Sequence, residues 1–275
     1  MKTRVIVAVA LLPLLLLVVL ALPPVWTAVL VASMGVIAVW ELLHETGLAP
    51  HSRLIAYSMV MAVAVSIWSY CGCPLKWALV GGWIYFAALF LELLAAHAKL
   101  QFHEICISAF AGIVIPLCLS ALVRILRLEN GKYYILVAFI LAFTSDSGAY
   151  FAGRAFGRHK LAPVISPNKT VEGFVGGIMS NVIGFGLAGW IYCVCFSASV
   201  NYPLLLMMGF ISALLGTLGD LSASYIKRSC HIKDFGNIIP GHGGILDRFD
   251  SMLLVSPFLY IVIRLIHPIW PIIIH

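Results

Sequence analysis

The chain has 275 residues, of which 62% are hydrophobic and only 10% charged, and its mean hydropathy is +1.05. A soluble domain carries roughly 25% charged residues, so this composition excludes a water-soluble fold and predicts that lipid is the solvent for most of the surface. The net charge of +6 is more typical of cytoplasmic loops and anionic headgroups than of nucleic-acid binding, because the aromatic residues lie mostly inside apolar runs.

Nine apolar runs approach the length of about 20 residues that a helix needs to cross the hydrocarbon core. In chain order they lie near 5–22, 24–43, 54–70, 77–96, 104–124, 133–152, 173–196, 202–220 and 252–270. The first run follows Met1-Lys2-Thr3-Arg4 as in a signal peptide, but no small-x-small cleavage site follows it, so we interpret it as a retained helix. We expect an all-α polytopic membrane protein with about nine helices, and eight or ten remain open.

The distribution of Lys and Arg predicts that the N-terminus is cytoplasmic. With this orientation, twelve of the 17 Lys and Arg residues fall in cytoplasmic segments, and the segment 124–132 is the main exception. Two long polar segments, near 153–172 and 221–251, then face the cytoplasm together. The seven cysteines match no zinc-ligand spacing and are interpreted as small apolar residues of membrane helices.

All five aspartates lie in the second half of the chain: Asp146, Asp220, Asp234, Asp247 and Asp250. Asp146 and Asp220 are near the cytoplasmic ends of predicted spans, where an ionisable group normally faces a cavity or a partner. The glutamates of the first half are Glu41, Glu45, Glu92, Glu104 and Glu129. Most of these lie at helix ends and are expected to be solvated or to snorkel, whereas Glu92 lies within a run and is a candidate functional acid.

Asp220 begins a regular polar pattern that continues with Ser224, Lys227 and Arg228. The spacing of i, i+4, i+7 and i+8 places these side chains on one face if the helix extends this far. An amphipathic helix on lipid headgroups would give the same pattern, so the stripe alone leaves a functional and a structural interpretation open.

The segment that follows contains Lys233-Asp234 and then Pro240-Gly241-His242-Gly243-Gly244-Ile245-Leu246-Asp247-Arg248-Phe249-Asp250. Asp247 and Asp250 share a helix face, and together with Asp220 they would offer three oxygen ligands to a hard cation such as Mg²⁺. Helix capping is the alternative for these acids. The glycines allow backbone N–H groups to approach an anion closely, or form a plain turn.

The first polar segment offers matching positive charge. It reads Asp146-Ser-Gly-Ala-Tyr-Phe-Ala-Gly-Arg154, and later Ser166-Pro-Asn168-Lys169-Thr-Val-Glu172-Gly173. The candidate ligands of a polyphosphate or lipid phosphate are Arg154, Arg158, Lys160 and Lys169, although a cytoplasmic loop carries cations in any case. Lys169, which lies between Asn168 and Thr170, is the best candidate of the four. Gly173 and Gly177 have the small-xxx-small spacing that is typical of helix packing.

These motifs resemble a known family. Ser224-x-x-Lys227-Arg228-x-x-x-x-Lys233-Asp234, followed by Pro240-Gly-His242-Gly243-Gly244-x-x-Asp247-Arg248-x-Asp250, closely resembles the signature of phosphatidate cytidylyltransferases (CDP-diacylglycerol synthases). The two motifs of the first polar segment are also similar to that family, so the likeness covers about residues 145–251. Residues 1–140 share only their hydrophobic helices with it.

The resemblance implies transfer of a cytidylyl group from CTP to phosphatidic acid, giving CDP-diacylglycerol and pyrophosphate in a Mg²⁺-dependent reaction. It also implies a site with a second metal ion and leaves a homodimer open. We therefore expect N-terminal helices over 1–140 and a catalytic membrane region over 141–275, in a bacterial inner membrane with the active site facing the cytoplasm. Membrane lipids are expected partners and nucleic acid is not.

The expected roles follow from the resemblance. Asp220, Asp247 and Asp250 would hold metal; Lys227, Arg228 and Lys233 would hold CTP phosphates; Lys169 and Arg248 would contact either substrate. His242 would either donate a hydrogen bond to a phosphate or serve as a structural turn residue. The predicted catalytic residues are Lys227, Arg228, Lys233, Asp234, His242 and Arg248. The predicted substrate-binding residues are Asp146, Arg154, Asn168, Lys169, Ser224, Gly243 and Gly244.

Two other functions compete with this one. A CDP-alcohol phosphotransferase also uses clustered aspartates and Mg²⁺, but its D-G-x-x-A-R pattern is missing from this sequence. An ion-coupled transporter would place carboxylates near helix centres, whereas here they lie mostly at the borders of polar segments.

Overall fold

The computed structural model describes residues 13, 15–128, 130–196, 199–239, 243–266 and 272–274. Seven helices in these ranges are long and apolar enough to cross a membrane, and each corresponds to a predicted span. The chain is therefore a mostly helical, polytopic integral membrane protein. The run predicted at 252–270 is a shorter apolar helix, Met252–Ile266, and most of the run at 5–22 lies outside the described residues, so the count of nine stays a prediction.

The chain divides into two compact units. The first comprises residues 1–129 and 226–249, and the second comprises 130–225 and 250–275. The segment from Lys227 to Phe249, which carries most of the family-like signature, therefore folds with the N-terminal helices. Asp220 and Asp250 belong to the second unit.

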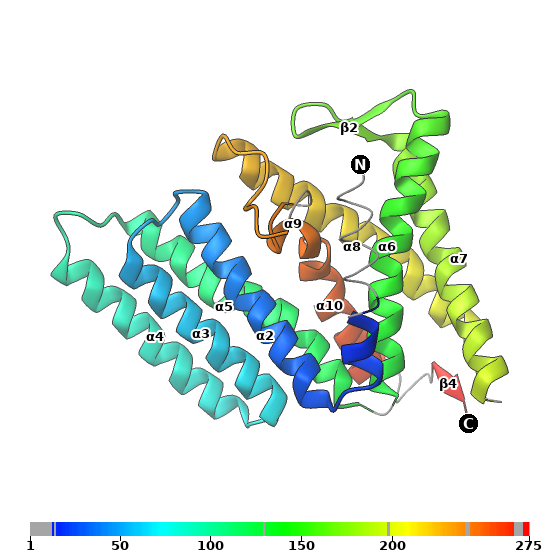
Figure 1. Ribbon diagram of the computed structural model, residues 1–275, viewed down its shortest axis with the longest axis horizontal. Coiled ribbons are helices and arrows are strands. Elements are labelled where there is room, and N and C mark those ends of the chain that lie inside the picture. The colour runs from blue at the N-terminus through cyan, green and yellow to red at the C-terminus, as the bar shows by residue number, and fades with distance from the viewer. Residues whose placement is uncertain are drawn as a thin grey trace. The chain divides into compact units, whose positions relative to one another are not determined.

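The first unit is built on four long helices that run side by side (Figure 1). They are α2 (Pro24–Trp40), which continues as the π-helical turn η1 (Glu41–Glu45), α3 (Ser52–Cys71), α4 (Leu75–Ala95) and α5 (Phe102–Leu126). The helices α2, α3 and α5 pack against one another, and the short helix α9 (Leu246–Phe249) contacts α2. The helix α4 buries only Tyr85 and Leu89, so its remaining apolar side chains suit contact with lipid.

Polar side chains tie these helices together. The Glu92 carboxylate accepts hydrogen bonds from Arg53 Nη1 at 3.1 Å and from the Tyr57 hydroxyl at 3.2 Å, which links α4 to α3. Tyr85 donates to the Ser108 carbonyl at 2.7 Å and lies 2.8 Å from Ser58 Oγ. Glu92, a candidate functional acid from the sequence, therefore has a structural partner set within the first unit.

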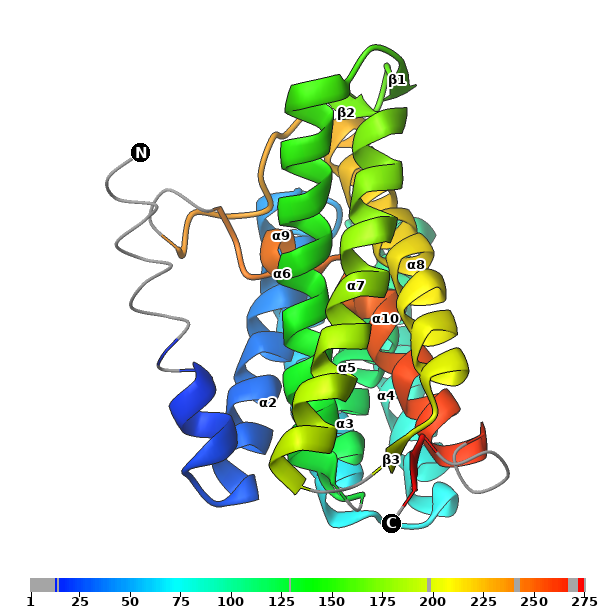
Figure 2. The same ribbon diagram turned by 90° about the vertical axis from the view of Figure 1, so that its right-hand side faces the viewer.

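The second unit contains the paired helices α6 (Gly131–Phe156) and α7 (Val171–Phe196), with the antiparallel hairpin β1 (Lys160–Ala162) and β2 (Ser166–Thr170) between them in sequence. Figure 2 shows α6 and α7 side by side with the hairpin at one end of the pair. The unit also holds most of α8 (Tyr202–Ser229), then α10 (Met252–Ile261), η2 (Val262–Ile266) and the short pair β3 (Ser199–Val200) and β4 (Ile273–Ile274).

Both polar segments are shorter than the sequence suggests. The helix α6 extends to Phe156, and the rest of the first segment is largely the hairpin. The helix α8 extends to Ser229, so the second segment begins at Cys230. The continuation of α8 confirms the condition under which Asp220, Ser224, Lys227 and Arg228 share a helix face.

Small residues allow α6 and α7 to approach closely. A Cβ atom on Gly173 would lie 2.8 Å from the Ala149 carbonyl oxygen, and one on Gly177 would lie 3.2 Å from the Ser145 carbonyl oxygen. A Cβ atom on Gly176 would collide with Ala152 Cβ. The prediction that Gly173 and Gly177 serve helix packing is confirmed.

Candidate active site

The second unit contains a partly open cavity of about 540 Å³. Its walls come from α6, the β1–β2 hairpin, α7, α8 and the start of α10. Five predicted site residues line it: Asp146, Arg154, Asn168, Lys169 and Asp220. Two motifs of the first polar segment and the first acid of the α8 stripe therefore meet in one cavity.

The hairpin is held in place by the first turn of α7. Thr170 Oγ1 accepts the Gly173 N–H at 3.1 Å and so caps the start of α7. The Glu172 carboxylate accepts the Arg158 N–H at 3.0 Å and lies 2.7 Å from His159 Nδ1, which fixes the entry to β1. Because both ends of the hairpin are anchored, the position of Lys169 on β2 is fixed relative to the cavity.

Lys169 and Asp220 form an ion pair in this cavity, between β2 and α8. Their side chains are 26% and 32% exposed, so both remain accessible to a ligand. Ser224 Oγ donates to Asp220 Oδ1 at 3.4 Å, one helical turn further along α8. The three residues form one connected group.

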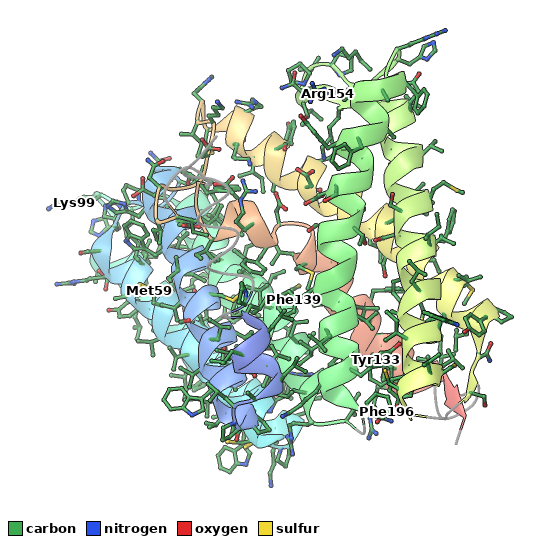
Figure 3. The ribbon with its side chains drawn as sticks, turned by 45° about the vertical axis from the view of Figure 1, so that its right-hand side comes forward. Met59, Lys99, Tyr133, Phe139, Arg154 and Phe196 are labelled. Atoms are coloured by element: carbon green, nitrogen blue, oxygen red, sulfur yellow. The ribbon has the colours of Figure 1, made fainter. Side chains whose placement is uncertain are left out.

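Arg154 adds a second cation near the hairpin. Figure 3 shows it at the hairpin end of α6, whereas Tyr133 and Phe196 lie at the opposite end of the α6–α7 pair. Its Nη1 donates to the Tyr150 hydroxyl at 3.3 Å, and both residues line the cavity. Charged groups of both signs are therefore concentrated at this end of the second unit.

Asp220 and Asp250 are brought close together by the backbone. A Cβ atom on Gly219 would lie 2.7 Å from the Asp250 carbonyl oxygen, so the two chain segments touch at this point. The Asp250 residue is buried, and its Oδ1 accepts the Ser251 N–H at 2.7 Å. Two of the three predicted metal ligands therefore lie on neighbouring backbone segments of the second unit.

Asp247 accepts hydrogen bonds from several parts of the signature segment, which runs from Lys227 to Phe249 in the first unit. Its Oδ1 accepts a hydrogen bond from Lys227 Nζ at 2.6 Å, and its Oδ2 accepts the Phe235 N–H at 2.8 Å and the Gly244 N–H at 3.0 Å. The Asp247 side chain is 3% exposed and that of Lys227 is 11% exposed. Gly243 has φ of +84°, a conformation that favours glycine, and makes the close approach to Asp247 possible.

The remaining predicted residues of the first unit are on its surface. Arg228 donates to the Ile232 carbonyl at 3.3 Å, and Lys233, Asp234 and Arg248 are exposed. His242 lies outside the described residues. The roles assigned to these residues stay predictions.

Glu41 is the residue that sequence reasoning missed. The expectation that it is solvated is wrong, because the residue is 0% exposed and its carboxylate accepts two backbone N–H groups of the signature segment. The signal available in the sequence was a carboxylate at the end of an apolar run, since an acid at that depth requires a partner. Nothing in the sequence identifies a partner that lies 204 residues away.

The donor set of the cavity fits a hard cation. The carboxylates of Asp146 and Asp220 line it together with the neutral oxygens of Asn168 and Thr170. Mg²⁺ commonly binds through one or two carboxylates and completes its shell with water and substrate phosphates. Among the described residues, no group of three or more His, Cys, Asp or Glu side chains is arranged to hold a metal, so the triad of Asp220, Asp247 and Asp250 stays a prediction.

These features define a class: a polytopic membrane protein with a cavity lined by charged side chains of both signs. The chain belongs to the cytidylyltransferase family, whose model matches residues 2–266.

Curated relatives bear the name phosphatidate cytidylyltransferase. The chain is 46% identical over 165 residues to the protein of that name from Bacillus subtilis (strain 168), a match that covers 60% of each chain. It is 50% identical over 135 residues to the one from Staphylococcus aureus (strain COL), which covers 49% of this chain and 50% of the relative. The matched segments therefore span between half and three fifths of the relatives' lengths.

Proposed function

We propose that the chain is a phosphatidate cytidylyltransferase, which transfers the cytidylyl group of CTP to phosphatidic acid and releases pyrophosphate. The observation that carries this proposal is the ion pair of Lys169 and Asp220, which brings the family-like motif around Lys169 and the acid that begins the α8 stripe together in one cavity. Membership of the cytidylyltransferase family and the name that the bacterial relatives share support it.

The reaction needs little proton transfer from the protein. A phosphatidate oxygen, already anionic at neutral pH, attacks the α-phosphorus of CTP; the new P–O bond forms as the bond between the α- and β-phosphates breaks, and pyrophosphate leaves. The site must reduce the repulsion between two polyanions and hold them for in-line attack. Cations and oriented hydrogen-bond donors meet these needs, and a general base is not required.

Lys169 and Arg154 supply positive charge to the cavity, and Asn168 adds a neutral polar group. Lys169 and Asp220 are each other's counter-ion, so an entering phosphate competes with Asp220 for the lysine. Ser224 holds the Asp220 carboxylate from the next turn of α8. The pair therefore stays charge-balanced until a phosphate group arrives.

Asp220 and Asp146 are the residues of this cavity that would hold Mg²⁺. When bound, the ion would neutralise phosphate charge and polarise the reacting phosphoryl group. Asp247 and Asp250 as further ligands, and a second metal ion, are proposed on the family resemblance. Lys227, Arg228, Lys233 and Arg248 are proposed CTP phosphate ligands on the same ground, with Asp234, His242, Gly243 and Gly244 in the segment that carries them.

The proposed site faces the cytoplasm of a bacterial inner membrane. The distribution of Lys and Arg along the chain supports this orientation, and the relatives named above are bacterial. CTP would then enter from water and phosphatidic acid from the bilayer.

The test is a turnover assay in proteoliposomes with CTP labelled at the α-phosphate. We expect labelled CDP-lipid and an equal amount of pyrophosphate only when phosphatidic acid and Mg²⁺ are both present. Consumption of added CDP-diacylglycerol with an alcohol would instead indicate a CDP-alcohol phosphotransferase. Absence of turnover together with ion-gradient-driven solute uptake would indicate a transporter.

A further inference from the structure

Glu41 is a buried carboxylate that the proposed reaction does not use. It is the first residue of the π-helical turn η1, at the end of α2, and is 0% exposed. Taking a carboxylate out of water is costly unless hydrogen bonds compensate for the lost solvation. The compensation in the described structure comes from the signature segment within the same compact unit.

The two carboxylate oxygens of Glu41 each accept one backbone N–H. Oε1 accepts the Ile245 N–H at 2.8 Å, and Oε2 accepts the Leu246 N–H at 2.7 Å. The N–H of the preceding residue, Gly244, is bound by Asp247. Two carboxylates therefore hold three successive N–H groups, and this arrangement fixes the backbone that leads into Asp247.

Two glycines of the same segment make room for Glu41. A Cβ atom on Gly244 would lie 2.6 Å from Glu41 Cδ, and one on Gly236 would lie 3.0 Å from Glu41 Oε1. The segment therefore contacts the Glu41 carboxylate at two points, next to Phe235 and at Gly244, which both donate their N–H groups to Asp247. These two contacts indicate that the Glu41 side chain occupies a specific position against the segment.

We propose that Glu41 is a positioning residue for the reaction: it holds residues 243–247 so that Asp247, with its partner Lys227, keeps the geometry that substrate binding requires. This inference rests on the proposed function for its effect on turnover. Its structural part, that Glu41 restrains residues 243–247, stands on the hydrogen bonds alone. The N-terminal helices then hold the segment that carries Asp247 as well as anchoring the chain in the membrane.

The test compares Glu41→Gln with Glu45→Gln in the full-length protein. The glutamine amide presents one oxygen and one NH₂ group, so one backbone N–H loses its acceptor. Glu45 is on the same π-helical turn, its side chain is 37% exposed and it contacts His44 at 3.2 Å, which makes it the matched control. Gly236→Ala is a second, milder variant, which places a methyl group against the Glu41 carboxylate and leaves the carboxylate in the protein.

Two measurements are made on each variant. Hydrogen–deuterium exchange should rise in residues 243–249 of Glu41→Gln, with the peptides of α3 to α5 and the unfolding temperature nearly unchanged. The kcat for CDP-lipid formation should fall about tenfold or more, with a smaller fall for Gly236→Ala and part of the activity kept by Glu41→Asp. Glu45→Gln should match wild type in both measurements.

Unchanged exchange in residues 243–249 of Glu41→Gln would overturn the inference, as would increased exchange with wild-type turnover. Faster exchange throughout the protein with a large drop in unfolding temperature would also overturn it, because Glu41 would then serve folding in general. If the wild-type protein itself makes no CDP-lipid, the proposed function fails, and the exchange measurement still decides whether Glu41 restrains the segment.

Discussion

At the scale of single residues, opposite charges from distant parts of the sequence meet in pairs. Lys169 and Asp220 are 51 residues apart and form an ion pair in the cavity of the second unit. Lys227 and Asp247 are 20 residues apart and form a buried pair in the first unit. The first pair is partly exposed and the second is not, so the two should respond differently to substitution.

The first prediction concerns the cation of the cavity. Lys169→Gln should lower kcat/KM for CTP roughly 10- to 100-fold, because it removes a charged hydrogen-bond donor from the phosphate site. Lys160→Gln is the matched control, since Lys160 belongs to the same hairpin but donates to the Pro167 carbonyl and is exposed. Equal rates for the two variants in the labelled-CTP assay would contradict the assignment of Lys169.

The second prediction separates the two acids by stability. Asp247→Asn leaves the buried Lys227 without its counter-ion and should destabilise the protein by roughly 3 kcal/mol. Asp220→Asn should cost much less stability, because the Asp220 side chain is 32% exposed and water can solvate Lys169. Thermal unfolding in detergent measures the difference, and similar unfolding temperatures for both variants would refute it. Both should lose most of their CDP-lipid synthesis.

Residue patterns predicted part of this arrangement. The stripe from Asp220 to Arg228 was recognisable because helical spacing is a local property, and α8 does extend through it. Lys169 was recognisable as the best candidate cation, but its pairing with Asp220 is a tertiary contact. The role of Glu41 was not predictable, because its partners are backbone N–H groups and every residue other than proline carries one.

At the scale of elements, the α6–α7 pair is the framework of the cavity. Gly173, Gly176 and Gly177 lie where α7 approaches α6, and several residues of both helices line the cavity. In lipid, where apolar burial between helices gives little driving force, such close packing of small residues is a main source of association. The shape of the cavity therefore depends on the close contact between α6 and α7.

The third prediction tests the close packing of α6 against α7. Gly176→Ala places a Cβ where it would collide with Ala152 and should destabilise the protein by about 1–3 kcal/mol. Gly81→Ala on α4 is the control: nothing lies within 4 Å of its added Cβ, so the change should be neutral or stabilising by up to about 1 kcal/mol through helix propensity. A Gly176→Ala protein that unfolds at or above the temperature of the Gly81→Ala protein would contradict the packing argument.

Seven of the predicted spans were recognisable as elements because each is a long apolar run with a polar boundary. The β1–β2 hairpin was not, since its strands are short and contain Pro167 and charged residues. It forms because Thr170 and Glu172 anchor its two ends to the start of α7. Hydropathy does not record such side-chain anchors. The predicted span ends at residue 152, whereas α6 continues to Phe156 and includes Arg154.

At the scale of the whole molecule, the residues of the family-like signature are divided between two compact units. Asp220 and Asp250 fold in the second unit, whereas Asp247 and the cations from Lys227 onward fold in the first. The catalytic region that the sequence predicts over residues 141–275 stays a prediction, because contiguity in the chain does not show which segments fold together. The grouping of residues 226–249 with the N-terminal helices depends on contacts such as that of Glu41 with Leu246.

The fourth prediction concerns orientation in the membrane. In a background without other cysteines, Val164→Cys should react with a membrane-impermeant maleimide only from the cytoplasmic side, because Val164 is 90% exposed in the hairpin. A variant that keeps only the exposed native Cys73, between α3 and α4, should react only from the opposite side. Labelling of both from one side of right-side-out vesicles would refute the predicted alternation of spans.

The most direct test of the central claim is an experimental structure in lipid with Mg²⁺ and a CTP analogue whose α–β bridging oxygen is replaced by methylene. We predict density for the triphosphate in the cavity lined by Asp146, Lys169 and Asp220, with Lys169 on a phosphate oxygen and a cation between the phosphates and Asp220. A triphosphate bound outside this cavity, with the pair of Lys169 and Asp220 undisturbed, would contradict the account.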